Sequence, residues 1–275
     1  MKARNLEISV VSDLHLGSHA CKAKSFLKYL KSIHPETLVL NGDIIDSWRF
    51  NKSFFPKSHL KVFRYLIKMM EKGIKIVYIS GNHDEFIRRF NKAELGNLKI
   101  CNQIVLELNG SKTWIFHGDI FDHIIHRAKW LARFASAIYE FMTMINKLAN
   151  PVKRFSEGKE LLIFLKIKKL LTSDQTGYSR FEKAAGMAAI KRNCQTVICG
   201  HTHAPVDKTI TTESGCVRYI NCGDWVKHLT ALEYHGGEWV LYHFTEPEEE
   251  PAADDSDIPG KKELYNSLYN ELAVF

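Results

Sequence analysis

Five short apolar runs, each followed directly by a motif of Asp, Asn, Gly and His, constrain the fold of this 275-residue chain more than any other feature. The runs 8–11, 38–40 and 76–79 are followed by S-D-L-H, N-G-D and S-G-N-H-D, and the runs 113–116 and 196–199 by H-G-D and G-H-T-H. Apolar runs of this length predict buried strands, and ligands of open α/β folds bind beyond the carboxyl ends of strands. We therefore expect the five motifs to converge on one site, with Asp43 of N-G-D at its centre.

Helical patterns alternate with the first strands. Residues 22–34 and 57–72 place apolar side chains at helical spacing, and Gly73 is suited to end the second helix. Strand pairs follow, and alternation of this kind favours a mixed α/β fold in which a β-sandwich is flanked by helices. The expected hairpins join 99–108 to 112–117 around an Asn-Gly turn, 217–220 to 229–234, and 229–234 to 239–242 around a Gly-Gly turn.

Residues 122–192 interrupt this alternation because they are helical in character almost throughout. We expect three helices, at about 123–148, 158–171 and 178–193, and residues 120–192 hold 14 basic and 6 acidic side chains. The insertion can be a plainly packed layer with a solvated basic face, or its wide apolar surface, edged by lysines, can receive another molecule, and these two interpretations are not exclusive. The predicted domains are a core over 1–121 and 193–245, a helical cap insertion over 122–192, and an acidic, apolar-poor, disordered tail over 246–275.

The net charge of +7 is distributed unevenly. Residues 245–275 hold nine acidic side chains and two lysines, so the other 244 residues hold 36 basic and 22 acidic side chains, a net of +14. A basic body favours an anionic partner, such as a phosphorylated substrate, an acidic lipid surface or nucleic acid.

The chain lacks the usual signals for a membrane span or for secretion. It has no run of 18 apolar residues, and its N-terminus has no apolar stretch of the secretory type. Its six cysteines form no C-x-x-C pair, which is typical of reduced thiols. We expect a cytoplasmic protein.

The side chains that follow the five runs form a set suited to metal binding. The expected ligands are Asp13, His15, Asp43, Asn82, His117, His201 and His203. Carboxylate, amide and imidazole groups without thiolate suit Mn²⁺, Fe²⁺, Zn²⁺ or Co²⁺ and disfavour Ca²⁺. Alternate residues at a strand end point the same way, so D-x-H and H-x-H can each direct two side chains to the site. Each motif alone is more often a polar turn or surface pair, but five in order make a chance explanation weak.

Together, D-x-H, G-D, G-N-H-D, H-G-D and G-H-T-H resemble the calcineurin-like metallophosphoesterase superfamily, over about residues 7–121 and 194–244. The resemblance implies a four-layer β-sandwich and two divalent ions, with Mn²⁺ favoured. It implies that Asp13, His15, Asp43 and His203 bind one ion, and that Asp43, Asn82, His117 and His201 bind the other. Two ions bridged by one carboxylate lower the pKa of a water between them, and the resulting hydroxide can attack phosphorus in line.

Asp43 and His83 are the expected catalytic residues. His83 follows the ligand Asn82, so it can face the leaving oxygen as an acid or as a cation. Either Asp46 or Asp84 could orient His83. The expected substrate contacts are Asn82, His83, Asp122, Trp48 and Arg49. Asp119 is assigned either to the surroundings of the metal ligands or to the substrate, and Asn221 and Asp224 to a structural role in preference to direct substrate contact.

Three longer phrases, S-D-L-H-L-G, G-D-I-I-D-S-W and G-H-T-H-A-P, together with the insertion, resemble the UDP-2,3-diacylglucosamine diphosphatase family of lipid A synthesis. The resemblance implies cleavage of a pyrophosphate to UMP and 2,3-diacylglucosamine 1-phosphate, a cap over the acyl chains, and peripheral contact with the inner membrane surface. The best-known members carry arginine where this chain has His83, the usual residue of the superfamily. A related but different substrate therefore stays open.

Two alternative functions stay open as well. The basic body is compatible with a nuclease or another metallophosphodiesterase, although nucleic-acid binders usually interleave aromatic and basic residues, and the insertion reads as amphipathic helix instead. A non-catalytic scaffold of the same fold is disfavoured, because such a protein should have lost ligands and all seven are present.

Overall fold

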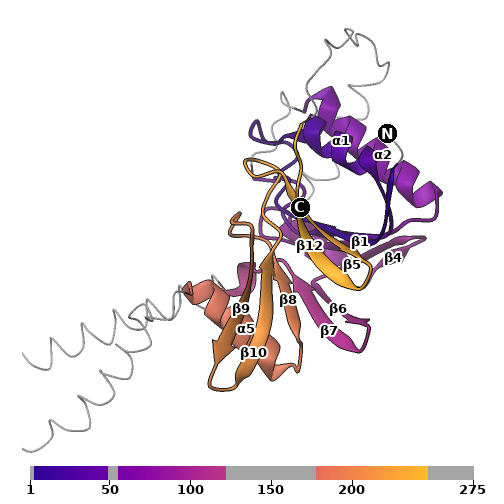
Figure 1. Cartoon of the computed structure of the whole chain (residues 1–275). Coiled ribbons are helices and arrows are strands. Elements are labelled where there is room, and N and C mark those ends of the chain that lie inside the picture. Colours follow the sequence, from indigo (N-terminus) through magenta and orange to yellow (C-terminus); the bar gives the residue numbers. More distant parts are fainter. Residues whose placement is uncertain (1–2, 49–54, 122–177, 247–275) are drawn as a thin grey trace, which may run out of the picture.

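The computed structural model describes residues 3–48, 55–121 and 178–246. Its strands form two mixed sheets stacked face to face (Figure 1). The strands are β1 (Arg4–Val11), β2 (Ile33–Asn41), β3 (Lys75–Ile79), β4 (Glu94–Leu95), β5 (Leu98–Cys101), β6 (Gln103–Leu108), β7 (Ser111–Phe116), β8 (Thr196–Cys199), β9 (Val206–Thr212), β10 (Gly215–Asn221), β11 (Thr230–His235) and β12 (Glu238–His243). The described helices are α1 (Ala23–Ser32), α2 (Lys57–Glu71) and α5 (Arg180–Lys191), with a 3₁₀ helix η1 (Glu85–Phe90).

Parallel strands form the centre of each sheet. The first sheet has the order β12-β11-β1-β2-β3-β5-β4, and the second has the order β6-β7-β8-β10-β9. In the first, β1, β2, β3 and β5 run parallel, and in the second, β7, β8 and β10 do. The motif-bearing ends of neighbouring strands therefore lie at one edge of each sheet, where ligands bind in such folds.

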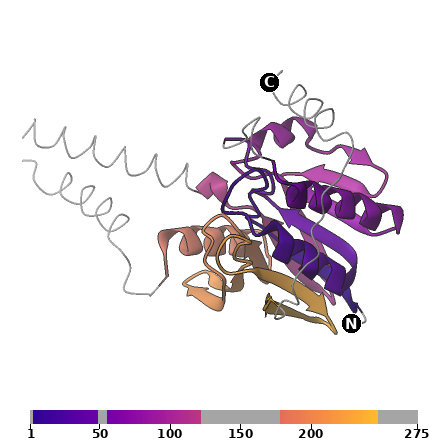
Figure 2. The same cartoon turned by 90° about the horizontal axis from the view of Figure 1, so that it is seen from above.

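The core lies in three layers of apolar side chains between four layers of structure. Side chains alternate along β7, so Ile115 packs between the two sheets while Trp114 and Phe116 face the other side, with α5. The outer face of the first sheet is covered by α1 and α2, which bury Phe26 and Val62 there (Figure 2). The α/β four-layer sandwich expected from the sequence is confirmed.

The two predicted helices of the first half are confirmed with small shifts at their ends. Helix α1 ends at Ser32, because the chain enters β2 at Ile33, and α2 ends at Glu71. Gly73 follows the second helix with φ +86°, a conformation that glycine adopts without a steric penalty. Among the described helices, none combines the length and the apolar character needed to cross a membrane.

Two of the predicted hairpins are confirmed. Strands β6 and β7 pair antiparallel around Asn109 and Gly110, which have φ +50° and +76°, and β11 and β12 pair around the Gly-Gly turn. Positive φ at both central residues is the requirement of the two-residue type I′ turn.

The sequence prediction was wrong where the chain moves from one sheet to the other. Residues 99–108 are not one strand, because β5 pairs with β3 in the first sheet and β6 pairs with β7 in the second. Likewise, 217–220 and 229–234 form no hairpin, because β10 pairs with β8 and β9 while β11 pairs with β1. An apolar pattern predicts that a strand is buried but does not indicate to which sheet it belongs. The passage of the chain from one sheet to the other therefore could not be predicted from the pattern.

Helix α5 packs on the second sheet, where it buries Phe181, Ala185 and Ala189 against β8, β9 and β10. The helix expected at 178–193 thus exists, but its packing places it in the sandwich rather than in the insertion. The prediction for 122–177 lies outside the described residues. Strand β9 was not predicted, and its alternation is weak because only Ile210 is buried.

Candidate metal centre

The loops that follow the strands are joined to one another by backbone hydrogen bonds. The N–H of Asp13 donates to the carbonyl of Gly42 over 3.1 Å, and the N–H of His15 donates to the carbonyl of Asp43 over 2.9 Å. In the second sheet, the N–H of Gly200 donates to the carbonyl of His117 over 2.9 Å. The loops after β1 and β2 therefore run together, as do the loops after β7 and β8.

Most of the expected ligands lie in an unusual backbone conformation. The φ angles of Asp13, His15, Asp43, His201 and His203 are +53°, +54°, +54°, +66° and +57°. Non-glycine residues seldom adopt positive φ, and strain of this kind clusters at functional sites. The D-x-H and H-x-H side chains were predicted to point the same way because of strand alternation. That prediction was wrong in its cause, because these residues have positive φ and are not extended.

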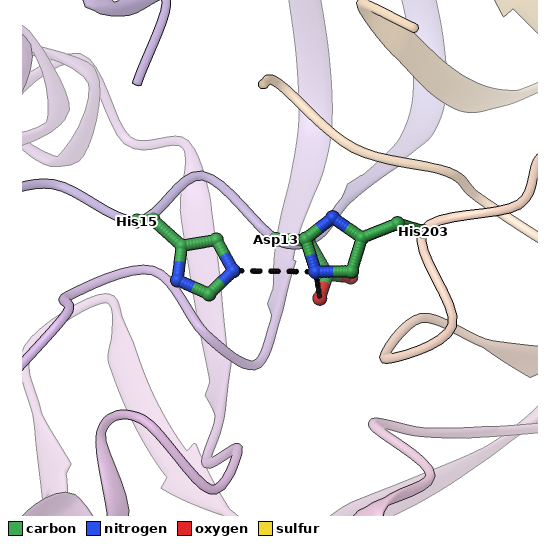
Figure 3. A group of neighbouring side chains, drawn as sticks. All are labelled: Asp13, His15 and His203. Atoms are coloured by element: carbon green, nitrogen blue, oxygen red, sulfur yellow. Dashed lines mark hydrogen bonds and ion pairs between the residues drawn. The ribbon is translucent and has the colours of Figure 1, made fainter. Parts of the chain in front are cut away.

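The first cluster contains Asp13, His15 and His203 (Figure 3). Nε2 of His203 lies 3.3 Å from Oδ1 of Asp13 and 3.4 Å from Nε2 of His15, and the two imidazole rings are stacked. The other oxygen of Asp13 accepts a hydrogen bond from the backbone N–H of His201 over 2.9 Å. One oxygen of Asp13 is thus held by the backbone, and the other faces Nε2 of His203.

The second cluster contains Asp43, His117 and His201. Oδ2 of Asp43 lies 3.3 Å from Nε2 of His117 and 4.0 Å from Nε2 of His15. Oδ1 of Asp43 accepts a hydrogen bond from the backbone N–H of His83 over 2.8 Å. Asp43 therefore presents one oxygen between the histidines of two clusters, which is the arrangement that a carboxylate shared by two ions needs.

Glycines let the backbone approach these carboxylates. A Cβ on Gly200 would lie 2.6 Å from Oδ2 of Asp13 and 2.5 Å from Oγ of Ser12. A Cβ on Gly81 would lie 2.2 Å from Oδ1 of Asp43. The glycines of G-H-T-H and G-N-H-D are therefore required by space, because any side chain would displace a carboxylate.

His117 is oriented by the backbone, and its other nitrogen faces Asp43. Its Nδ1–H donates to the carbonyl of Asn41 over 2.9 Å. Burial alone would lower the pKa of His117, but the adjacent Asp43 carboxylate raises that pKa to about 10. Burial likewise opposes ionisation of Asp43, yet the adjacent imidazole of His117, with Nε2 3.3 Å from Oδ2, holds the pKa of Asp43 well below its ordinary value. A divalent cation between the two groups would replace the shared proton.

The donor set fits divalent metal ions. Three side-chain atoms of the expected ligands are buried and have no hydrogen-bond partner among the described residues: Oδ1 of Asp13, Oδ1 of Asn82 and Nε2 of His117. Orphaned buried polar atoms are rare in folded proteins, so such a group calls for a ligand. Carboxylate, amide and imidazole atoms are the ligands that Mn²⁺, Fe²⁺ and Zn²⁺ accept.

Asp224 orients His203 of the first cluster through the ring nitrogen that does not face Asp13. Its Oδ2 lies 3.1 Å from Nδ1 of His203 and 3.2 Å from Nδ1 of His228, and its Oδ1 accepts three backbone N–H groups. Burial opposes the charge, but these hydrogen bonds hold the pKa of Asp224 well below its ordinary value. Asn221 donates to the carbonyl of Gly200 over 2.7 Å. These contacts agree with the structural role expected for both residues.

His83 stands beside the two clusters and is oriented by Asp46. Oδ1 of Asp46 lies 3.1 Å from Nδ1 of His83, and the exposed indole of Trp48 covers the ring with centroids 4.1 Å apart. Asp84, the other candidate for orienting His83, instead accepts hydrogen bonds from the hydroxyl of Tyr78 and the backbone N–H of Ile44. Burial raises the pKa of Asp84.

Some site residues were not predicted, and others cannot be placed. Arg49 and Asp122 lie outside the described residues. Asp119 pairs with Arg88, which the sequence analysis did not single out. His228 and the Asn41 carbonyl were also missed, because neither a lone histidine nor a backbone oxygen is marked by any motif.

The comparisons with known proteins agree with this geometry. The family model for calcineurin-like phosphoesterase matches residues 6–205. The curated UDP-2,3-diacylglucosamine hydrolase of Aliivibrio fischeri (strain MJ11) is 27% identical over 256 residues, which is 86% of this chain and 98% of the relative. The protein of that name from Pectobacterium carotovorum subsp. carotovorum (strain PC1) is 26% identical, over 78% of this chain and 89% of the relative. The predicted resemblance is confirmed: the chain belongs to the calcineurin-like phosphoesterase family and is a hydrolase of phosphoester or pyrophosphate bonds.

Proposed function

We propose that the chain hydrolyses the pyrophosphate of UDP-2,3-diacylglucosamine, releasing UMP and 2,3-diacylglucosamine 1-phosphate with the aid of two divalent ions, Mn²⁺ being favoured. The substrate is suggested by the name of the curated relatives, which align over 98% and 89% of their own length. On this proposal the enzyme works at the cytoplasmic face of the inner membrane, where its lipid substrate lies, and residues 122–177 cap the acyl chains.

The position of Asp43 is the single observation that carries the dinuclear proposal. Its Oδ2 lies within 4.0 Å of both His15 and His117, which belong to different clusters. Asp13, His15, Asp43 and His203 would hold one ion, and Asp43, Asn82, His117 and His201 would hold the other. When bound, the two ions supply positive charge for the phosphoryl oxygens and lower the pKa of water.

His83 is proposed to donate a proton to the leaving phosphate oxygen. Because Nδ1 of His83 faces Asp46, its Nε2 is the atom left for the substrate. The Asp46 carboxylate fixes the orientation of the ring. Trp48 excludes water from one side of the ring and offers an apolar surface to a bound substrate.

Substrate binding beyond the ions is assigned to the residues that the sequence analysis proposed as substrate contacts. Asn82 and His83, after β3, would face the phosphates, and Trp48, after β2, together with its sequence neighbour Arg49, would contact the rest of the substrate. Asp122 adjoins the beginning of the insertion. A nucleotide-sugar lipid offers both the anionic and the apolar groups that this set would contact.

The proposal is tested by loading the protein with Mn²⁺ and measuring UMP release from UDP-2,3-diacylglucosamine. UDP-N-acetylglucosamine, which lacks the acyl chains, is the matched control substrate, and bis-p-nitrophenyl phosphate reports phosphodiesterase chemistry. We expect turnover of the lipid substrate to exceed that of both controls. Equal or faster hydrolysis of the generic diester, without UMP release, would instead support another metallophosphodiesterase activity, and preferential cleavage of nucleic acid would support a nuclease.

A further inference from the structure

The outer surface of helices α1 and α2 is strongly basic. Residues 22–32 hold four lysines and no acidic residue, and residues 57–72 hold five basic residues and one acidic residue. The two helices lie side by side on the first sheet (Figure 1). We use the name basic face for the outward surface formed by Lys24, Lys28, Lys31, Lys61, Arg64 and Lys68, all of which are exposed or half-buried.

The chain after β12 arrives at α1, one of these two helices. The ring of Phe244 packs against Tyr29 of α1 and against Trp225, with centroid distances of 6.3 and 5.8 Å. Two residues further on, the carboxylate of Glu246 accepts a hydrogen bond from the hydroxyl of Ser25 on α1. The last described residue therefore lies on α1.

The segment that begins at Glu246 has the opposite charge. Residues 246–257 contain seven acidic side chains and no basic one. An extended segment of this length spans up to roughly 40 Å, whereas a 15-residue helix is only about 22 Å long. The acidic segment therefore reaches every part of the basic face from its attachment at Ser25.

We infer that the acidic segment 246–257 binds intramolecularly to the basic face of α1 and α2. A tethered segment is present at an effective concentration in the millimolar range, so even a weak, salt-dependent attraction keeps it bound. The segment then screens the basic face from other polyanions, including an anionic lipid surface. The inference does not depend on the identity of the substrate proposed above.

The contact is tested directly with a carbodiimide, which joins a carboxylate to a lysine amine only when the two touch. The full chain is treated at low salt and at 1 M salt, and the joined peptides are identified by mass spectrometry. We expect residues 246–257 to be joined to Lys24, Lys28, Lys31, Lys61 or Lys68 at low salt, with a several-fold loss at high salt. Cross-links at equal yield to the exposed lysines Lys75, Lys112 and Lys191, or none to the basic face, would overturn the inference.

The screening is tested with vesicles of phosphatidylglycerol and phosphatidylcholine. A full-length variant with Glu248→Gln, Glu249→Gln, Glu250→Gln, Asp254→Asn, Asp255→Asn and Asp257→Asn keeps the length of the segment and removes most of its charge. We expect this variant to bind anionic vesicles at least several-fold more tightly than the wild type, and the added triple change Lys24→Gln, Lys31→Gln and Lys68→Gln to remove the gain.

The matched control for this experiment adds Lys75→Gln, Lys112→Gln and Lys191→Gln to the same neutralised segment, so that its net charge equals that of the helix variant. We expect the control to retain the gain in vesicle binding. Unchanged binding of the neutralised variant, or equal loss in both triple variants, would show that the segment does not cover the basic face. Thermal unfolding of each variant checks that the fold is intact.

Discussion

Asp46 and His83 form a close carboxylate–imidazole pair at the edge of the metal centre, with 3.1 Å between Oδ1 and Nδ1. The other oxygen of the same carboxylate lies 3.6 Å from Nδ1 of His15. Burial opposes the charge of Asp46, but its contacts with His15 and His83 lower the pKa of Asp46 to about 2. Asp46 is therefore ionised at neutral pH and orients both an expected metal ligand and the expected general acid.

Replacing Asp46 by Asn tests this pair. Asn preserves the shape but removes the charge, so we expect kcat to fall by about 10- to 100-fold with a smaller change in KM. Steady-state kinetics of Asp46→Asn, His83→Ala and the double variant measure the coupling. The two losses should be far from additive, since Asp46 acts through His83. Fully additive losses with both ions retained would mean that Asp46 acts independently of His83.

Replacing Asp43 by Asn tests the shared carboxylate. We expect activity to fall by about a thousandfold or more and both ions to bind weakly, because each ion loses a charged ligand. Metal content is measured by mass spectrometry after dialysis against a fixed concentration of Mn²⁺. Asp207→Asn is the matched control, because Asp207 pairs with Arg218 on the surface and should leave metal content unchanged. Loss of one ion with the other retained in Asp43→Asn would contradict the shared position.

Replacing Gly200 by Ala tests the close approach of backbone to carboxylate. The added Cβ would meet Asp13 and Ser12 at 2.6 and 2.5 Å, so Asp13 must move. We expect metal affinity to fall by about 10- to 100-fold and the free energy of unfolding to fall by about 1–3 kcal/mol. Isothermal titration with Mn²⁺ and urea unfolding measure the two effects.

Gly96→Ala provides the comparison for that substitution. Gly96 has φ +56° but open space around its Cβ position. Alanine there should lower stability by about 1–2 kcal/mol through backbone strain while leaving Mn²⁺ affinity unchanged. If both variants lost metal affinity equally, the effect at Gly200 would come from general destabilisation and not from the carboxylate.

His59 should make stability depend on pH. Its Nδ1 accepts a hydrogen bond from the N–H of Gly17 over 3.0 Å, and burial lowers the pKa of His59 to about 4. The unfolded chain therefore takes up a proton near pH 6.5 that the folded chain takes up only near pH 4. The contribution of neutral His59 to the free energy of unfolding is fully present above pH 6.5. It is lost progressively as the pH falls from 6.5 to about 4.

Urea unfolding of the metal-free protein at pH 7.5 and pH 5.0 measures this loss. In His59→Asn the Oδ1 atom replaces Nδ1 as the acceptor but does not titrate. We expect the wild type to lose about 1–2 kcal/mol more than the variant between the two pH values. An equal loss in both proteins would assign the pH dependence to other histidines.

The sequence by itself determined that strands end in a convergent set of carboxylate, amide and imidazole side chains. Asp13, His15 and His203 are brought together, and Asp43 lies between His15 and His117, from positions up to about 190 residues apart in the chain. This was predictable because apolar runs locate strands and the carboxyl ends of parallel strands share an edge. The helices α1 and α2 were predictable for a similar reason. The helical spacing of their apolar residues and the glycine after α2 are local features of the sequence.

Only the tertiary structure decided which strand enters which sheet and which neighbours hold each site residue. The crossing between β5 and β6 depends on partners that are distant in sequence, β3 for one and β7 for the other. Asp46, and not Asp84, is the partner of His83, because the Asp84 carboxylate accepts hydrogen bonds from the Tyr78 hydroxyl and from two backbone N–H groups. Residue types reveal which chemistry a chain can support, but pairing and orientation come from long-range packing, which leaves no local periodic signal.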